Sequence, residues 1–205
     1  MRRKAIYVVS MMVLAAIGTA AEKVGADISA VERERALAQL KDTRNGLQEA
    51  VKGLSEAQWN YKAGPDKWSI AEVAEHLALT EELITKGIFP QLANAPAPGD
   101  THDASKVDAK IAAVMPDRST KYQAPDMLHP TGRWTPSVSV EHFLAARAET
   151  VKFLNTTHDL RGHVVSHPAF GPLDGYEWVL AVAGHTARHT QQILEVKADA
   201  GYPKK

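Results

Sequence analysis

The stretch from Asp174 to Lys197 reads DGYEWVLAVAGHTARHTQQILEVK. Along it, apolar residues and histidines return at steps of three and four, which is the period of one face of an α-helix. Asp174 and Glu177 form a capping signature at its start. We therefore predict a helix from about residue 174 to residue 199, with one face turned toward a core. The residues on that face are Trp178, Val182, His185, His189, Ile193 and Val196.

His185 and His189 lie four residues apart on the predicted inner face. This spacing projects two side chains from the same side of a helix, about one turn apart, so that both imidazoles can reach one metal ion. Burying two imidazoles among apolar residues without partners is costly, and a metal removes that cost. The spacing alone also fits histidines that are satisfied in the core or that lie at an exposed end of a bundle. No glutamate follows His185 as in HExxH peptidases, so that enzyme class is excluded.

Three further segments have helical periodicity. The first begins at a capping box, Ser29 to Glu32, and its apolar stripe is Leu37, Leu40, Leu47, Val51 and Leu54. The second begins at another capping box, Ser69 to Glu72, and ends near Pro90; its stripe is Ile70, Val73, Leu77, Thr80, Ile84 and Ile88. The third begins after Thr135 and Pro136, and its inner face is Val140, Leu144, Val151 and Leu154.

Residues 93–137 break the helical pattern with prolines and glycines. Because a structureless link of this length is unusual inside a compact domain, we predict a crossover between two antiparallel helix pairs, with a short helix near residues 107–115. No segment alternates between apolar and polar residues, so no sheet is expected. The predicted fold is all-α: a four-helix bundle with a long crossover link between the second and third helices.

His76 adds a third imidazole to the pair. It borders the inner face of the second predicted helix, so a helix that faces the fourth one would supply it. Three imidazoles from two helices leave positions on a metal open for water. The chain has no cysteine, so any metal is held by nitrogen and oxygen, and zinc, nickel and ferrous iron all suit such ligands.

Three stretches carry a family resemblance: Leu54 to Trp59, Lys67 to Leu77 with His76, and Gly184 to Ile193 with the histidine pair. In this order and spacing, residues 28–200 resemble the DinB/YfiT-like family. The resemblance implies a four-helix bundle with a long crossover link. It also implies a divalent metal bound by one histidine of the second helix and two of the fourth, which match His76, His185 and His189.

Other polar residues near these positions are weaker candidates. Glu72 lies one turn before His76 and is a candidate to orient that ring, although its place in the capping box is the alternative role. Glu75 is a candidate general base. Arg188 is either a solvated arginine or a ligand for an anionic substrate. His163 and His167 also have the i, i+4 spacing, but they lie in a glycine- and proline-rich link, where the spacing has no geometric meaning.

The first 26 residues resemble a secretory leader: three basic residues, then an uncharged apolar run, then small residues. We therefore expect an exported protein, periplasmic or secreted, with residues 1–26 as a signal peptide and residues 27–205 as the folded domain. The alternative is an uncleaved N-terminal anchor, although the run is short for a membrane span. No other contact with a membrane is expected.

The three histidines and the composition indicate which classes of function are possible. The 24 basic residues equal the 24 acidic ones, so nucleic acid is not expected as a partner. The leading hypothesis is a metal-dependent hydrolase acting on a small molecule of unknown identity through a metal-activated water. One alternative, implied by the resemblance, is a metal-dependent thiol transferase or isomerase. The export signal argues against it, because those thiols are cytosolic. The other alternative is a non-catalytic metal-binding or stress-associated scaffold. We also expect a homodimer, since bundles of this kind often pair.

Overall fold

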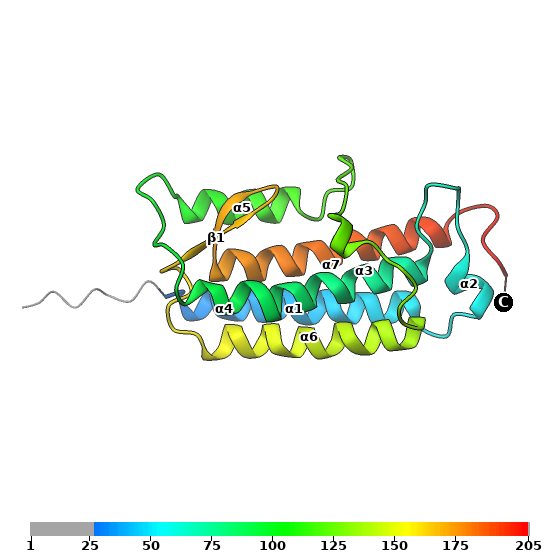
Figure 1. Cartoon of the computed structure of the whole chain (residues 1–205), viewed down its shortest axis with the longest axis horizontal. Helices are drawn as coiled ribbons and strands as arrows, with labels where there is room; N and C mark the ends of the chain where they lie inside the picture. The colour runs from blue at the N-terminus through cyan, green and yellow to red at the C-terminus, as the bar shows by residue number, and fades with distance from the viewer. Residues whose placement is uncertain (1–26, 205) are drawn as a thin grey trace, which may run out of the picture.

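The computed structural model describes residues 27–204, in which four long helices form a bundle (Figure 1). They are α1 (Ala30–Val51), α3 (Ile70–Leu83), α6 (Pro136–Thr156) and α7 (Gly175–Lys197). The predicted four-helix bundle is thus confirmed. The leader predicted for residues 1–26 lies outside the described residues. Within the described residues, no helix has the length and apolar character needed to cross a membrane.

The helix starts follow from local sequence. Ser29, Ser69 and Asp174 each accept a hydrogen bond from the backbone three residues later, and the glutamate at that position bonds back to the cap. These capping boxes satisfy N–H groups that the first turn of a helix leaves without partners. Ser55 caps the short helix α2 (Glu56–Asn60) in the same way, and Thr135 caps α6, which begins at Pro136.

The order of the helices around the bundle is α1, α7, α3, α6, and each packs mainly against its two neighbours in that ring. The two helices of each antiparallel pair, α1 with α3 and α6 with α7, therefore lie diagonally opposite. The colours of Figure 1 show α1 and α7 running in one direction and α3 and α6 in the other. Because α3 and α6 are parallel neighbours, the chain must return along the bundle between them. That return is the predicted crossover.

The crossover leaves α3 through a π-helical turn, η1 (Ile84–Ile88), and the short helix α4 (Phe89–Leu92). The N–H of Phe89 donates to the carbonyl of Ile84, five residues back, just before Pro90, which has no N–H to give. Next comes α5 (Ala104–Val114), which confirms the short helix expected in the link and packs on α7. A single 3-10 turn, η2 (Asp126–Leu128), precedes α6.

The expectation of no sheet was wrong. Strands β1 (Val164–His167) and β2 (Gly171–Asp174) form an antiparallel hairpin just before α7. Each strand has only four residues, too few for alternation to stand out in the sequence. Gly171 has a φ of 77°, which favours glycine, at the point where the second strand begins. The hairpin is held to the bundle by the indole N–H of Trp178, which donates to the carbonyl of Val165 at 3.2 Å.

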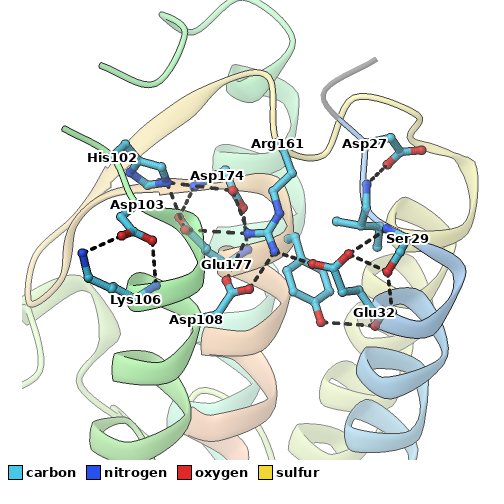
Figure 2. Close-up of polar contacts among 12 residues, drawn as sticks. Asp27, Ser29, Glu32, His102, Asp103, Lys106, Asp108, Arg161, Asp174 and Glu177 are labelled. Atoms are coloured by element: carbon cyan, nitrogen blue, oxygen red, sulfur yellow. Dashed lines mark hydrogen bonds and ion pairs between the residues drawn. The ribbon is translucent and has the colours of Figure 1, made fainter. Parts of the chain in front are cut away.

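Arg161 ties this end of the bundle together (Figure 2). Its guanidinium donates to Asp108 of α5, to Asp174 at the start of α7 and to Glu32 of α1, at 2.6–3.0 Å. His102 adds a contact from the crossover, with its Nε2 3.0 Å from a carboxylate oxygen of Glu177. Residues of α1, the crossover, the link before the hairpin and the start of α7 thus converge on one partly buried polar network.

A second buried network crosses the middle of the bundle. Arg147 of α6 and Glu81 of α3 form an ion pair, and each residue is 1% exposed. The guanidinium also donates to the carbonyl of Leu40 at 2.7 Å, and to the hydroxyls of Thr43 at 3.0 Å and Thr186 at 2.7 Å. The pair therefore joins all four long helices, and removing one partner would leave an uncompensated charge in the core.

We predict that Arg147→Met lowers the free energy of unfolding by about 3–5 kcal/mol, because Glu81 would stay buried without its partner. Urea unfolding followed by circular dichroism measures the loss. The matched control is Lys152→Met, which breaks the exposed pair with Glu149 on the same helix and should cause no measurable change. Equal effects of the two substitutions would contradict a structural role for the buried pair.

Candidate metal centre

Three imidazoles meet between α3 and α7. His76 comes from the second turn of α3, and His185 and His189 come from successive turns of α7, which runs antiparallel to α3. The structure brings one ligand-capable atom of each within 4.8 Å of the others. The ring centroids are 5.2 Å apart for His76 and His185, 4.7 Å for His76 and His189, and 4.4 Å for His185 and His189. We call these three residues the triad.

Hydrogen bonds at the far side of two rings fix which nitrogen is free. The Nδ1 of His76 lies 2.9 Å from the carbonyl of Leu128, and the Nδ1 of His189 lies 2.8 Å from the Oε1 of Gln192. Both partners are acceptors, and the same Gln192 oxygen also accepts from Arg118 at 3.4 Å. Each Nδ1 therefore carries the proton, and the lone pair of each Nε2 is left free.

The free nitrogens are placed as a metal requires. The Nε2 atoms of His76 and His185 are 3.3 Å apart. Two bonds of about 2.1 Å to a tetrahedral zinc ion place their nitrogens roughly 3.4 Å apart. If the Nε2 of His185 carried a proton, it could donate to only one of the other two Nε2 atoms. One cation at the centre can instead bind all three nitrogens. The residues present therefore fit a divalent metal with nitrogen ligands.

Burial keeps the triad in the form that binds metal. His76 is 3% exposed and His189 is 8% exposed, while His185 is partly exposed. Loss of water around the rings is the largest cause that lowers the pKa of all three; the neighbouring histidines lower the pKa values of His185 and His189 further. The pKa of His189 falls to about 3. All three imidazoles are thus neutral at pH 7, as ligation requires.

An indole forms one wall of the triad. The ring of Trp68, just before the cap of α3, lies 4.9 Å from the ring of His76 and stacks on His189 at 6.4 Å. An aromatic wall excludes water from one side and limits how the two imidazoles can turn. Neither this wall nor the acceptors Leu128 and Gln192 could be identified from the spacing of the histidines.

The two acidic candidates on α3 are engaged elsewhere. Glu72 accepts from the backbone N–H of Ser69 at 2.7 Å and from Lys62 at 2.7 Å, so it caps the helix, and a backbone carbonyl orients His76 in its place. Glu75 is 2% exposed and accepts backbone hydrogen bonds from residues 131–133 of the crossover. Its carboxylate therefore holds the link.

Arg188 also contacts the crossover. It is 7% exposed, and its guanidinium donates to the carbonyls of Asp117 and Thr120. The expectation of a solvated arginine was therefore wrong. Arginine is usually exposed at the protein surface, which is why the sequence favoured a solvated side chain. The carbonyls that enclose Arg188 belong to a distant part of the chain and could not be identified from the sequence.

The remaining histidines do not form a comparable site in the region that the structure describes. His163 bonds to the carbonyl of Ala95 at 2.6 Å, and His167 lies on β1, so the HxxxH string of the link does not converge. His102, Asp174 and Glu177 do cluster. However, an Arg161 nitrogen lies 2.9 Å from Asp174, so a guanidinium already supplies the cation there.

Comparison with known proteins supports this architecture. The model of the DinB superfamily matches residues 39–193, a range that includes the whole triad. The uncharacterized protein YuaE of Bacillus subtilis (strain 168) is 27% identical over 149 residues, which cover 72% of this chain and 88% of YuaE.

Two solved structures share the fold. YfiT from Bacillus subtilis is described as a probable metal-dependent hydrolase with an unusual four-helix bundle topology. It aligns with a TM-score of 0.59 and 17% identity, over 86% of this chain and 91% of YfiT. The four-helix bundle protein TT2238 aligns with a TM-score of 0.50 and 18% identity, over 80% of this chain and 98% of its own.

The low pKa of His189 makes the stability of the metal-free protein depend on pH. In the unfolded chain histidine takes up a proton near pH 6.5, whereas in the folded chain His189 does so near pH 3. The free energy of folding that comes from the neutral His189 is therefore fully present above pH 6.5. As pH falls below that value, the free energy of unfolding decreases by about 1.4 kcal/mol per pH unit.

We predict that the unfolding free energy falls more steeply for the metal-free wild type than for His189→Asn between pH 6.5 and pH 4.5. Urea unfolding in the presence of a chelator measures both proteins. Carboxylates that titrate in the same pH range contribute equally to the unfolding free energy of both proteins, so their contribution cancels in the difference. Parallel pH profiles would show that His189 is not held neutral in the fold.

Proposed function

Because the chain belongs to the DinB superfamily, we propose that it binds one divalent metal ion through His76, His185 and His189 and is a metal-dependent hydrolase. The observation that carries the proposal is the convergence of three neutral imidazoles, with two Nε2 atoms 3.3 Å apart. The description of YfiT as a probable metal-dependent hydrolase supports the reaction class. Zinc, nickel and ferrous iron all suit a set of nitrogen ligands.

The triad would provide the metal and leave room for a reactant. A divalent ion bound there would act as a Lewis acid and lower the pKa of water. Three protein ligands leave at least one position of a tetrahedral ion open. His185 is the only partly exposed member of the triad. Trp68 lies on the side of His76 and His189.

The hydrolase proposal and the scaffold alternative differ in the need for a base. Glu72 and Glu75, the two acidic residues of α3 nearest His76 in sequence, are committed to the helix cap and to the crossover. A hydrolase built on this triad would therefore depend on the acidity of water at the metal. Because both carboxylates are already hydrogen-bonded elsewhere, neither is placed to act as a general base. This favours the alternative, a non-catalytic metal-binding protein.

We propose, from the sequence, that residues 1–26 direct export. Export would place the bundle away from cytosolic thiols, which favours hydrolysis over thiol transfer. Mass spectrometry of the protein from its native host tests this: a mature chain that begins near residue 27 is expected, and a full-length cytosolic chain would contradict it.

Metal binding is predicted at one equivalent per chain. Zinc titrated into metal-free wild type should bind once, and His185→Asn should weaken binding by more than about tenfold, because one of three ligands is lost. Calorimetry and elemental analysis measure both quantities. His158→Asn is the control, since that side chain is 85% exposed and should leave binding unchanged. Equal zinc affinity in the wild type and His185→Asn would exclude the triad as the site.

Hydrolysis is tested separately from binding. Wild type loaded with zinc, nickel or iron is assayed on a panel of esters, amides and phosphoesters, next to His185→Ala treated in the same way. We expect turnover of at least one substrate class by the wild type and background rates for the variant. Equal rates on the whole panel would reject the hydrolase, and a wild type that binds metal without turnover would support the scaffold.

A further inference from the structure

We propose that the crossover segment 117–133, here called the strap, is part of the triad site and that Glu75 is the positioning residue that holds it there. The inference rests on the proposed metal site and adds to it a segment outside the two ligand-bearing helices that positions one ligand. Both anchors of the strap are sequence neighbours of ligands: Glu75 precedes His76, and Arg188 precedes His189. Between these anchors the strap contributes a backbone carbonyl to the triad.

The first anchor is a buried carboxylate that grips backbone amides. Glu75 accepts from the N–H groups of Thr131 at 3.0 Å, Gly132 at 2.8 Å and Arg133 at 3.4 Å. The side chain of Glu75 is 3% exposed, and the nearest cation, Arg133, is 3.5 Å away and 45% exposed. Successive backbone amides thus surround this carboxylate, together with the Thr131 hydroxyl at 3.3 Å. Gly132 has a φ of 72°, and this left-handed conformation lets neighbouring N–H groups point the same way.

The second anchor holds the other end of the strap. The guanidinium of Arg188 donates to the carbonyls of Asp117 and Thr120 and lies 5.2 Å from the ring of Tyr122. Among the residues that the structure describes, no carboxylate forms an ion pair with Arg188, so its bonds are to the strap backbone. The strap is thus attached to α7 at one end and to α3 at the other.

Between the anchors the strap reaches the triad. The turn η2 places the carbonyl of Leu128 2.9 Å from the Nδ1 of His76, and Leu128 is 9% exposed. His129 follows with its ring edge-on to Trp68 at 6.1 Å. Because the carbonyl of Leu128 keeps the proton on Nδ1, it presents the Nε2 lone pair of His76 to the other two rings. Glu75 therefore acts on His76 through the strap, with no contact with the metal itself.

The test compares Glu75→Gln with Glu72→Gln on the same helix. A glutamine at 75 has one acceptor oxygen and an amide group that repels the strap N–H groups, whereas a glutamine at 72 still completes the capping box and does not contact the strap. We expect Glu75→Gln to bind zinc roughly 10- to 100-fold more weakly in competition with a chelator, as for other groups that orient metal ligands. Glu72→Gln should bind like wild type. Amides 128–133 should exchange hydrogen faster in Glu75→Gln only.

A second variant distinguishes displacement of the strap from a general loss of folding in Glu75→Gln. Gly132→Ala adds a methyl group that meets nothing within 4 Å, so it disturbs only the left-handed backbone of the strap. It should weaken zinc binding and speed amide exchange in the same direction, with an unchanged helical spectrum. Wild-type zinc affinity and wild-type exchange in both Glu75→Gln and Gly132→Ala would overturn the proposal.

A measurement without metal separates this inference from the proposed function. Nitrogen NMR of the metal-free protein should show His76 as the Nδ1–H tautomer in wild type and as a mixture of tautomers in Glu75→Gln. If wild type binds no zinc, the proposed function fails, while this readout still decides the role of the strap. An unchanged tautomer in Glu75→Gln would refute positioning by Glu75.

Discussion

Three neutral imidazoles that face one another between α3 and α7 are the constraint on which the proposed metal site depends. The Nε2 atoms of His76 and His185 are 3.3 Å apart. Such an arrangement is unfavourable for protonated rings and costly for unpartnered neutral ones, and it becomes favourable when a cation is shared. The lowered pKa values keep all three rings neutral, and the acceptors on the far side of His76 and His189 direct a lone pair of each of these two rings inward.

The topology makes this arrangement possible. A helix can offer two imidazoles from one face, and a third must come from a neighbour whose face is turned toward it. The antiparallel packing of α3 against α7 provides that neighbour. The parallel packing of α3 with α6 then requires a long return link, and this link is the segment that covers the triad. The buried pair of Arg147 and Glu81 crosses the same bundle, and its contacts reach all four long helices.

Much of this could be predicted from the sequence, for identifiable physical reasons. Capping boxes and helical periodicity depend on residues only three or four positions apart, so the starts of α1, α3 and α7 were predicted well. The spacing of His185 and His189 is equally local. The periodicity of the second helix placed His76 at its inner face, and the resemblance to the DinB/YfiT-like family then grouped the three histidines. The hairpin before α7 was missed because strands of four residues carry too little pattern. The roles of Leu128, Glu75 and Arg188 depend on contacts with backbone groups of the crossover, and a backbone group leaves no residue-specific signal in a sequence.

The most direct test of the central claim is an X-ray structure of the zinc-loaded protein with anomalous diffraction measured on both sides of the zinc edge. The account predicts a single anomalous peak per chain, about 2.1 Å from one nitrogen of each of His76, His185 and His189. A peak at His102, Asp174 and Glu177, or no peak between α3 and α7 in protein that holds zinc in solution, would contradict it.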